Sequence, residues 1–359
     1  MRVLIFSDLH LHNWTYGATV DSSGMNSRLK VQKDFLDWVA DYGGVEAIIF
    51  CGDLVHTPNK LDMEVIEVAL SGLKKIAKKH KLDCFAILGN HDIKDASKNF
   101  TIANFFKQCG WNFIKNEKNF TLSSAKGTNL VPYCEDKLYP AREINFVSYC
   151  EDKDKALSIF SGLPKCDFIF THFGVKNVSV GSGFEIPNEV LSPNIIPSES
   201  ICFTGHYHRH QKVSDNLVVI GSPMQHTWGD SGDEKGVVIL DTESKEWEFV
   251  PYTAAPKFVE IHYDEDDSVD IVKGNYIRVI CDSEAPDMQV YREELIHKGA
   301  ISVEFRVAPI GPAPEIGSIN NYSQLNDIIE SYEKELDTRV KVVGRTIREG
   351  NYEALKYKH

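Results

Sequence analysis

The first half of this 359-residue chain alternates short apolar runs with longer segments in which apolar residues recur at helical spacing. The pattern predicts strands at residues 2–7, 45–51 and 84–88, with helices between them at residues 29–42 and 61–79. Alternation of this kind is typical of βαβ units, in which a helix returns the chain to the same edge of the sheet. We therefore expect an α/β fold with a largely parallel core sheet.

After Phe113 the pattern changes to a succession of short strands with a single helix near residues 152–160. The expected strands lie at residues 129–132, 144–148, 167–171, 200–204, 217–220, 236–240 and 246–250. This succession indicates a second, mixed sheet that packs on the first, so the predicted architecture is a sandwich of two sheets flanked by helices.

The last hundred residues are predicted to form an appendage to this sandwich. A boundary is expected near Pro256, so that residues 1–255 form the main domain and residues 256–308 a small α+β unit. Residues 309–318 are rich in proline and glycine and are predicted to be a linker. Residues 319–359 carry an apolar stripe at helical spacing, which fits either helices that dock on a partner or helices that pack on their own chain.

The composition is that of an ordinary globular protein, with 42% hydrophobic and 25% charged residues. No apolar run approaches the ~20 residues that a membrane-spanning helix needs, and the N-terminus does not resemble a signal peptide. None of the eight cysteines belongs to a Cys-x-x-Cys pair. We therefore expect reduced thiols and a cytoplasmic location.

Polar residues that suit metal binding follow five of the predicted strands. The motifs are Asp8-x-His10, Gly52-Asp53, Gly89-Asn90-His91-Asp92, His172 and Gly205-His206-x-His208. Because ligands of open α/β sheets lie at the carboxyl ends of the strands, we expect these side chains to meet at one edge. The glycines permit sharp turns there.

Carboxylate, imidazole and amide oxygen without thiolate form a donor set for a dinuclear site of harder ions. Asp8 and His10 are two residues apart on an extended chain, so both can face one ion, and His206 and His208 repeat this spacing. Asp53 is the natural bridge because one carboxylate has two oxygens to share. The donors favour Mn²⁺, with Mg²⁺, Fe²⁺ or Zn²⁺ as alternatives. Two such ions activate a water and stabilise the entering and leaving oxygens in phosphoester hydrolysis.

His91 adjoins a candidate ligand but is not itself needed as one. It is predicted to face the substrate, where it protonates the leaving oxygen or stabilises charge in the transition state. Asp92 is expected to be part of the catalytic machinery by orienting the His91 ring. His56 lies one turn beyond Asp53 and is a candidate for the edge of the site. The remaining histidines, His226 among them, are interpreted as surface or packing residues.

As a set, the five motifs within residues 1–250 resemble the signature motifs of the calcineurin-like metallophosphoesterases. The resemblance implies a four-layer sandwich of two mixed β-sheets flanked by helices. It also implies that one ion is bound by Asp8, His10, Asp53 and His208 and the other by Asp53, Asn90, His172 and His206, with His91 as the catalytic histidine.

A narrower resemblance rests on Gly52-Asp53-Leu54-Val55-His56 with Pro58, and on Gly221-Ser222-Pro223. These segments are similar to the SbcD-type subunit of the double-strand-break repair nuclease and to phage recombination nucleases. The resemblance implies a two-metal-dependent DNA exonuclease and endonuclease in which His56 helps to bind the DNA end. It also implies a capping domain, C-terminal helices that dock on an SbcC-type coiled-coil ATPase, a homodimer contact in residues 100–106, and a bacterial or phage-infected host cell.

Two other functions fit parts of the sequence. One is a phosphatase or phosphodiesterase of the same fold that acts on small phosphoesters. Ser/Thr phosphatases of this superfamily carry Gly-Asp-x-Val-Asp-Arg-Gly and Gly-Asn-His-Glu, whereas the differing positions here hold His56, Thr57 and Asp92. The arginine that would bind a phosphomonoester is therefore missing. The other is a non-catalytic scaffold, against which the intact ligand positions and His91 argue.

The formal net charge of −13 argues at first against a nucleic-acid partner. The charge is unevenly spread: residues 1–256 hold 26 basic and 32 acidic residues, residues 257–338 hold 7 and 18, and residues 339–359 hold 6 and 2. Most of the acidic excess therefore lies outside the candidate site, where two divalent ions would add positive charge. We expect weak, salt-sensitive DNA binding by this chain alone, with a partner supplying much of the positive surface.

Overall fold

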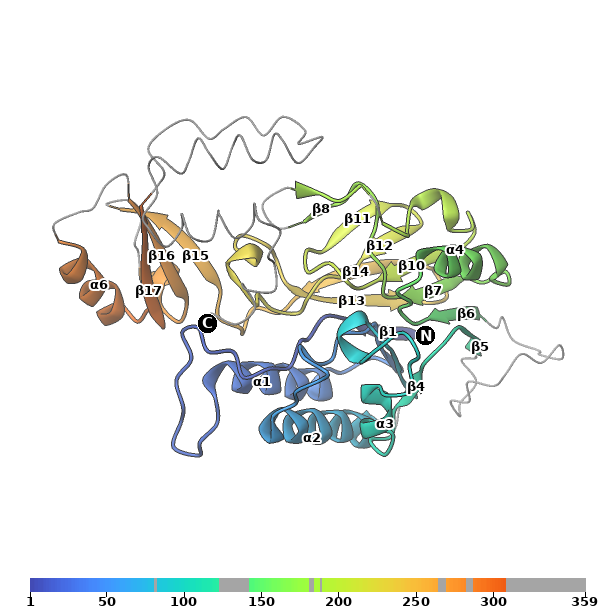
Figure 1. Cartoon of the computed structure of the whole chain (residues 1–359), viewed down its shortest axis with the longest axis horizontal. Helices are drawn as coiled ribbons and strands as arrows, with labels where there is room; N and C mark the ends of the chain where they lie inside the picture. Colours follow the sequence, from blue (N-terminus) through green and yellow to red (C-terminus); the bar gives the residue numbers. More distant parts are fainter. Residues whose placement is uncertain are drawn as a thin grey trace, which may run out of the picture. The chain divides into compact units, whose positions relative to one another are not determined.

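The computed structural model describes residues 1–80, 83–122, 142–180, 184–187, 189–263, 269–281 and 287–307. Within these ranges the chain forms two six-stranded sheets, one three-stranded sheet and one pair of short strands (Figure 1). The short pair is antiparallel and consists of β8 (Ser179–Val180) and β9 (Phe184–Glu185).

The first large sheet contains the three strands that the N-terminal alternation predicts. Across the sheet the order is β14 (Trp247–Pro251), β13 (Gly236–Asp241), β1 (Arg2–Phe6), β2 (Ala47–Phe50), β3 (Asp83–Ile87) and β4 (Asn112–Ile114). The strands β1 to β4 run parallel, whereas β13 is antiparallel to β1 and β14 is antiparallel to β13. The parallel strands therefore end at the same edge, as βαβ connections require.

The second large sheet is also mixed. Across it the order is β11 (Gln211–Ser214), β12 (Leu217–Val219), β10 (Ile201–Thr204), β7 (Phe168–Thr171), β6 (Arg142–Val147) and β5 (Lys118–Leu122). Its four central strands are parallel, and β11 and β5 are antiparallel edge strands.

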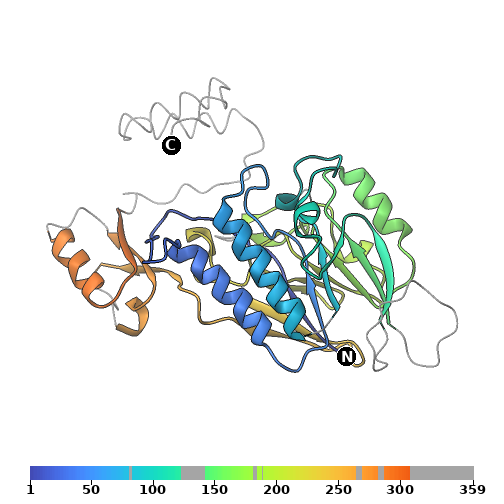
Figure 2. The ribbon, with the colours of Figure 1, turned by 90° about the horizontal axis from the view of Figure 1, so that it is seen from below.

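Helices cover the outer faces of the two sheets. They are α1 (Ser27–Asp41), α2 (Met63–His80), α3 (Ile102–Phe106) and α4 (Lys153–Gly162), with 3₁₀ turns at Asn90–Asp92, Pro193–Ile195 and Trp228–Asp230. Side chains of Asn26 and Asp152 cap the first turns of α1 and α4 by accepting hydrogen bonds from backbone N–H groups. Figure 2 shows α1 and α2 side by side across the face of the first sheet.

Alternation of side chains along the strands separates the layers of the sandwich. On β1, Ile5 faces the second sheet and belongs to the same buried cluster as Phe170 and Phe203. Its neighbour Phe6 points the other way and meets Phe35 of α1, with the ring centroids 5.6 Å apart. A third cluster lies between the outer face of the second sheet and α4. The result is four layers: helices, sheet, sheet and helix.

Residues 258–307 form a small sheet of their own within the compact unit Met1–Val307. This sheet has the parallel order β15 (Phe258–His262), β16 (Tyr276–Cys281) and β17 (Ser302–Val307). Helices α5 (Val269–Val272) and α6 (Met288–His297) accompany it, and it has its own apolar cluster.

Two expectations about the sheets need correction. The strands β13 and β14 were expected in the second sheet, but β13 pairs with β1 in the first sheet and β14 pairs with β13. The strand β11 was not expected, since three of its four residues are polar and it lies at an edge of the sheet. The strand predicted at residues 129–132, the linker at 309–318 and the helical region at 319–359 lie outside the described residues. No helix in the described residues is long and apolar enough to cross a membrane.

The central layer between the two large sheets predicts where the fold is most sensitive. Phe170 is fully buried there, whereas Val290 is 66% exposed on α6. We expect Phe170→Ala to lower the free energy of unfolding by about 3–5 kcal/mol, because it leaves a cavity between two rigid sheets. Val290→Ala should change it by less than about 0.5 kcal/mol. Urea denaturation of both variants measures the difference, and equal midpoints would contradict this account of the core.

Candidate metal centre

The carboxyl ends of five strands from the two large sheets meet at one place, and predicted site residues follow each of them. The pairs of element and residue are β1 with Asp8 and His10, β2 with Asp53, β3 with Asn90 and His91, β7 with His172, and β10 with His206 and His208. Since three of these strands belong to the first sheet and two to the second, the cluster exists only when the sheets pack with these ends aligned.

The backbone at the site is held in an uncommon conformation. Four of the seven non-glycine residues with positive φ in the described chain are predicted ligands: Asp8 (55°), His10 (46°), Asp53 (62°) and His206 (88°). Such conformations cost about 1–3 kcal/mol each and persist only where surrounding contacts fix them. Here the loops after β1 and β2 bond to one another, since the Asp8 N–H donates to the Gly52 carbonyl (2.9 Å) and the His10 N–H to the Asp53 carbonyl (3.0 Å).

Glycines allow these loops to approach one another closely. A Cβ on Gly89 would lie 2.1 Å from Asp53 Oδ1, and one on Gly205 would lie 1.9 Å from Ser7 Oγ and 2.7 Å from His172 Nδ1. All three distances are well inside van der Waals contact. Only glycine therefore fits at these two positions without moving a neighbouring site residue.

One group of donors consists of Asp8, His10 and His208, whose ligand atoms lie within 4.8 Å of one another. His10 Nε2 and His208 Nε2 are only 3.1 Å apart and face each other. Two nitrogens that each lie about 2.1 Å from one ion are separated by about 3 Å, so the spacing suits a shared cation. The other nitrogen of His10, Nδ1, is buried and has no hydrogen-bond partner among the described residues.

The second group contains Asp8, Asp53 and His172, with Asn90 and His206 beside it. Asn90 Oδ1 lies 3.2 Å from His172 Nε2 and 2.9 Å from His206 Nδ1. Asp53 Oδ2 lies 3.3 Å from His172 Nε2 and also 3.5 Å from His10 Nε2 of the first group. Asp53 is thus placed between the groups, which is the position that a bridging carboxylate needs. The donor set and its spacing fit two divalent cations.

Burial and mutual charge determine which of these groups carry protons when no ion is bound. Burial lowers the pKa of His206 to about 3 and also lowers the pKa of His10, so both rings are neutral at pH 7. Burial would lower the pKa of His172 as well, but Asp53 and Asp8 raise it to about 9. Burial opposes ionisation of Asp53, yet His172 and His10 hold the pKa of Asp53 below its usual value. A cation that took His172 as a ligand would therefore have to displace this proton.

His91 and His56 form the edge of the site. The His91 backbone N–H donates to Asp53 Oδ1 (2.8 Å), and the ring stacks on His56 with centroids 5.3 Å apart and planes at 15°. His91 Nδ1 lies 2.5 Å from the His56 carbonyl oxygen, which can only accept, so Nδ1 carries the proton and Nε2 is left for the substrate. Burial, followed by the charge of His91, lowers the pKa of His56 to about 4.

Asp92 makes contacts other than those expected from the sequence. Its buried carboxylate accepts hydrogen bonds from the backbone N–H groups of Asp53 (2.7 Å), Leu54 (2.8 Å) and Gly89 (3.0 Å). It therefore fixes the two loops that carry Asp53 and His91, whereas the His56 carbonyl is the group that orients the His91 ring. The expectation from the sequence did not take into account that the backbone N–H groups at these turns need an acceptor, which Asp92 supplies.

Two residues of the site were missed or undervalued in the sequence. His226 is 2% exposed, and its ring lies 5.4 Å from that of His10 and 5.3 Å from that of His208, with Nε2 2.9 Å from the Asp8 carbonyl oxygen. Asp230 Oδ1 lies 3.4 Å from His208 Nδ1. The segment Gly221-Ser222-Pro223 just before them was the available signal, because it placed another turn at the same edge.

Comparisons with known proteins identify the family of the chain. The model of the calcineurin-like phosphoesterase family matches residues 1–210. A protein of Invertebrate iridescent virus 3, assigned as phosphoesterase 078R, is 21% identical over 317 residues, which cover 81% of this chain and 83% of the viral protein.

Two solved structures also match part of the chain, at low identity. A Staphylococcus aureus protein assigned as a 5′-nucleotidase, in complex with alpha-ketoglutarate, is 14% identical with a TM-score of 0.37; the match covers 82% of this chain and 58% of that protein. Nuclease MPE of Pseudomonas putida is 12% identical with a TM-score of 0.27, and the match covers 69% and 87% of the two chains.

The close approach at Gly205 can be tested directly. We expect Gly205→Ala to displace His172 and Ser7, to lower the free energy of unfolding by about 1–3 kcal/mol through overpacking, and to reduce the amount of divalent metal bound by the purified protein. Gly162 at the end of α4 is the matched control, because a Cβ there meets nothing within 4 Å. Urea denaturation and elemental analysis measure both effects. Identical behaviour of the two variants would contradict the steric account.

Proposed function

Since the chain belongs to the calcineurin-like phosphoesterase family, whose members use two metal ions, we propose that it is a metal-dependent DNA nuclease of the SbcD type. In this proposal it hydrolyses phosphodiester bonds at DNA ends, as exonuclease and endonuclease, in recombination or repair. The observation that carries the proposal is the convergence of the two donor groups, joined by Asp53, beside the paired rings of His91 and His56.

The proposed assignment shares Asp53 between the two ions and gives Asp8, which lies in both groups, to the first ion only. Asp8, His10, Asp53 and His208 would hold one ion, and Asp53, Asn90, His172 and His206 would hold the other. When bound, the two ions supply an activated water and positive charge for the entering and leaving oxygens. Mn²⁺ is the proposed metal because the donors are oxygen and imidazole with no thiolate, and Mg²⁺, Fe²⁺ or Zn²⁺ are alternatives.

His91 is proposed as the general acid. Its Nδ1–H is held by the His56 carbonyl, so the ring cannot turn, and Nε2 is the nitrogen left to donate a proton to the leaving oxygen. His91 is partly exposed, as a group that must touch the substrate needs to be.

A polymeric substrate is favoured over a phosphomonoester by the residues beside His91. Thr57 stands where the phosphatases of this superfamily have an arginine for the terminal phosphate. The ring of His56 occupies the adjacent position and is neutral at pH 7, because its pKa is about 4. A neutral ring can lie beside a diester and its sugar without requiring a dianionic phosphate. His56 is therefore proposed as a DNA-end-binding residue.

Hydrolysis assays with the full chain test this proposal. We expect Mn²⁺-dependent degradation of linear double-stranded DNA that falls at least about 10²-fold in His91→Asn, the lower range for loss of a general acid, while Mn²⁺ content stays unchanged. His262→Asn, an exposed histidine on β15, is the matched control and should retain full activity. Hydrolysis of small phosphoesters without cleavage of DNA would replace the nuclease with a phosphatase or phosphodiesterase. Absence of bound metal in the native protein would contradict both enzymatic hypotheses, the nuclease and the phosphatase or phosphodiesterase, and would leave the non-catalytic scaffold.

We also propose two macromolecular partners besides DNA. Residues 319–359 are proposed to dock on an SbcC-type coiled-coil ATPase. The ATPase would add the basic surface for DNA that this chain, with its net negative charge, does not supply. A homodimer contact is proposed at α3, where Phe105 is 59% and Phe100 65% exposed.

Truncation after Gly317 tests the ATPase partner. We expect the full chain to co-purify with the coiled-coil ATPase and the truncated chain to lose it, because the apolar stripe of the docking helices is removed. Light scattering should give both forms the mass of a dimer, since α3 is retained. Retention of the ATPase by the truncated chain, or a monomeric mass for both forms, would contradict the corresponding proposal.

A further inference from the structure

The segment between β12 and β13 contains a buried group of charges that lies outside the set of metal ligands. Asp230 is 3% and Lys235 7% exposed, and their charged atoms are 2.9 Å apart. Charged side chains are rarely buried unless they are paired, and even a paired burial is costly. The role of this buried ion pair beside the candidate metal centre must therefore be sought in the groups that Asp230 and Lys235 contact.

The two oxygens of Asp230 have separate tasks. Oδ2 accepts hydrogen bonds from the backbone N–H groups of His226 (3.0 Å) and Thr227 (3.1 Å), which closes the 3₁₀ turn Trp228–Asp230. Oδ1 faces away from this turn and lies 3.4 Å from His208 Nδ1. The first oxygen thus builds the loop, and the second reaches the metal centre.

His208 is held at two points by this ion pair. Lys235 Nζ donates to the His208 backbone carbonyl (2.7 Å), while Asp230 Oδ1 lies next to the ring nitrogen Nδ1. An ionised carboxylate can only accept, so the proton of the neutral ring is placed on Nδ1. The lone pair of His208 is then on Nε2, the atom that faces His10 Nε2 at 3.1 Å.

We propose that Asp230, held by Lys235, is a positioning residue that fixes the tautomer and direction of the His208 ring and so builds one half of the dinuclear site. Carboxylates that accept from the second nitrogen of a ligand histidine raise its basicity and fix its orientation. The inference rests on the proposed metal site, because it takes His208 as a ligand.

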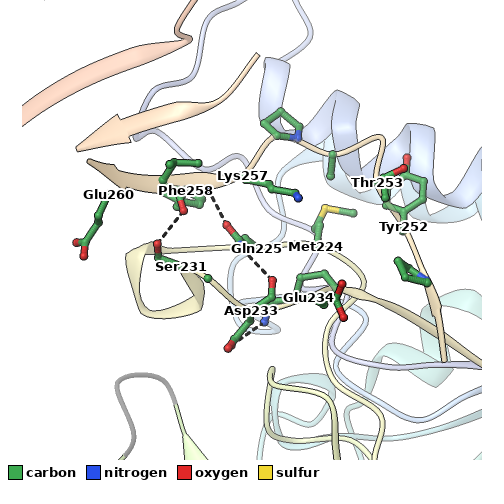
Figure 3. Close-up of a pocket in the computed structure, with 16 residues that line it drawn as sticks. Met224, Gln225, Ser231, Asp233, Glu234, Tyr252, Thr253, Lys257, Phe258 and Glu260 are labelled. Atoms are coloured by element: carbon green, nitrogen blue, oxygen red, sulfur yellow. Dashed lines mark hydrogen bonds and ion pairs between the residues drawn. The ribbon is translucent and has the colours of Figure 1, made fainter. Parts of the chain in front are cut away.

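The opposite side of the loop is fixed independently of the ions (Figure 3). Gln225 accepts from the Phe258 N–H (2.6 Å) and donates to the Asp233 carbonyl (3.0 Å), and Ser231 donates to the Phe258 carbonyl (2.8 Å). A cavity of about 300 Å³ lies on this side, and Asp230 does not line it. The loop is therefore anchored to β15, so Asp230 has a fixed place from which to hold His208 before any metal binds.

The substitution Asp230→Asn separates the two tasks. An asparagine oxygen can still accept from the two backbone N–H groups of the turn, but its neutral side chain no longer attracts the Nδ1 proton of His208. We expect the Mn²⁺ affinity of one of the two sites, measured by calorimetry on metal-free full-length protein, to fall about 10- to 100-fold. The other site should bind as before, so that elemental analysis after desalting gives one ion per chain in place of two.

Asp233→Asn is the matched control. Asp233 lies in the same loop and also faces Lys235 Nζ (3.5 Å), but its other charged neighbour is Arg209 rather than His208. This variant should bind two Mn²⁺ ions with native affinity. An equal loss of Mn²⁺ affinity in both variants would overturn the proposal. It would show that the affinity depends on the charge of the loop and not on the contact with His208.

A double variant tests whether Asp230 acts through His208. If it does, Asp230→Asn should cost no further Mn²⁺ affinity once His208→Gln has been introduced. An additive loss would overturn the proposal.

The protonation of the His208 ring can be observed without any variant, so this test remains even if Asp230→Asn fails to fold. In native protein labelled with ¹⁵N-histidine and loaded with Zn²⁺, the His208 ring should show a protonated Nδ1. A protonated Nε2 would contradict the proposal. Native protein that binds two ions and cleaves DNA sustains the proposed function whatever these variants do.

Discussion

The rest of the site depends on the contacts of the Asp53 carboxylate. One oxygen accepts from the His91 backbone N–H, and the other lies between His10 and His172, one ring from each donor group. Its own backbone has a φ of 62°, and its N–H is held by Asp92. A buried carboxylate without cationic neighbours or hydrogen bonds would be very costly, so this position is stable only because imidazoles and backbone donors compensate it.

This constraint explains why so many unusual local features gather at one edge of the sandwich. Left-handed backbone at Asp8 and Asp53 turns the chain immediately after β1 and β2, which keeps both carboxylates at the strand ends instead of letting them extend into solvent. Gly89 and Gly205 then allow the neighbouring loops to pack against them without a Cβ. The strain is supported by the four-layer core, in which the strands leading to the site are almost completely buried. The stability of the core is what permits a strained, highly charged edge.

Much of this arrangement was predictable because it depends on positions at the ends of strands. The spacing of apolar runs placed Asp8, Asp53 and His172 at such ends, and the rule for parallel sheets then brought them together although they are far apart in sequence. The sheet to which β13 belongs was not predictable, since an apolar strand can be buried in either sheet. The contacts of Asp92 and Asp230 were not predictable either, because a carboxylate that accepts backbone N–H groups leaves no periodic pattern and its donors depend on loop geometry.

The two halves of the metal centre are held by different parts of the fold. His172 is oriented from within the core, since its Nδ1 lies 2.7 Å from the Cys51 carbonyl oxygen at the end of β2. His208 is oriented by Asp230, in a loop that is bound to β15 of the small parallel sheet. Arg28 of α1 reinforces this second connection, because it donates to the His226 carbonyl and its guanidinium lies 5.3 Å from the Phe258 ring. Because this loop connects the small sheet to His208, a shift of that sheet would move His208 and leave His172 in place. The first donor group is therefore the half of the site whose geometry depends on the position of residues 258–307.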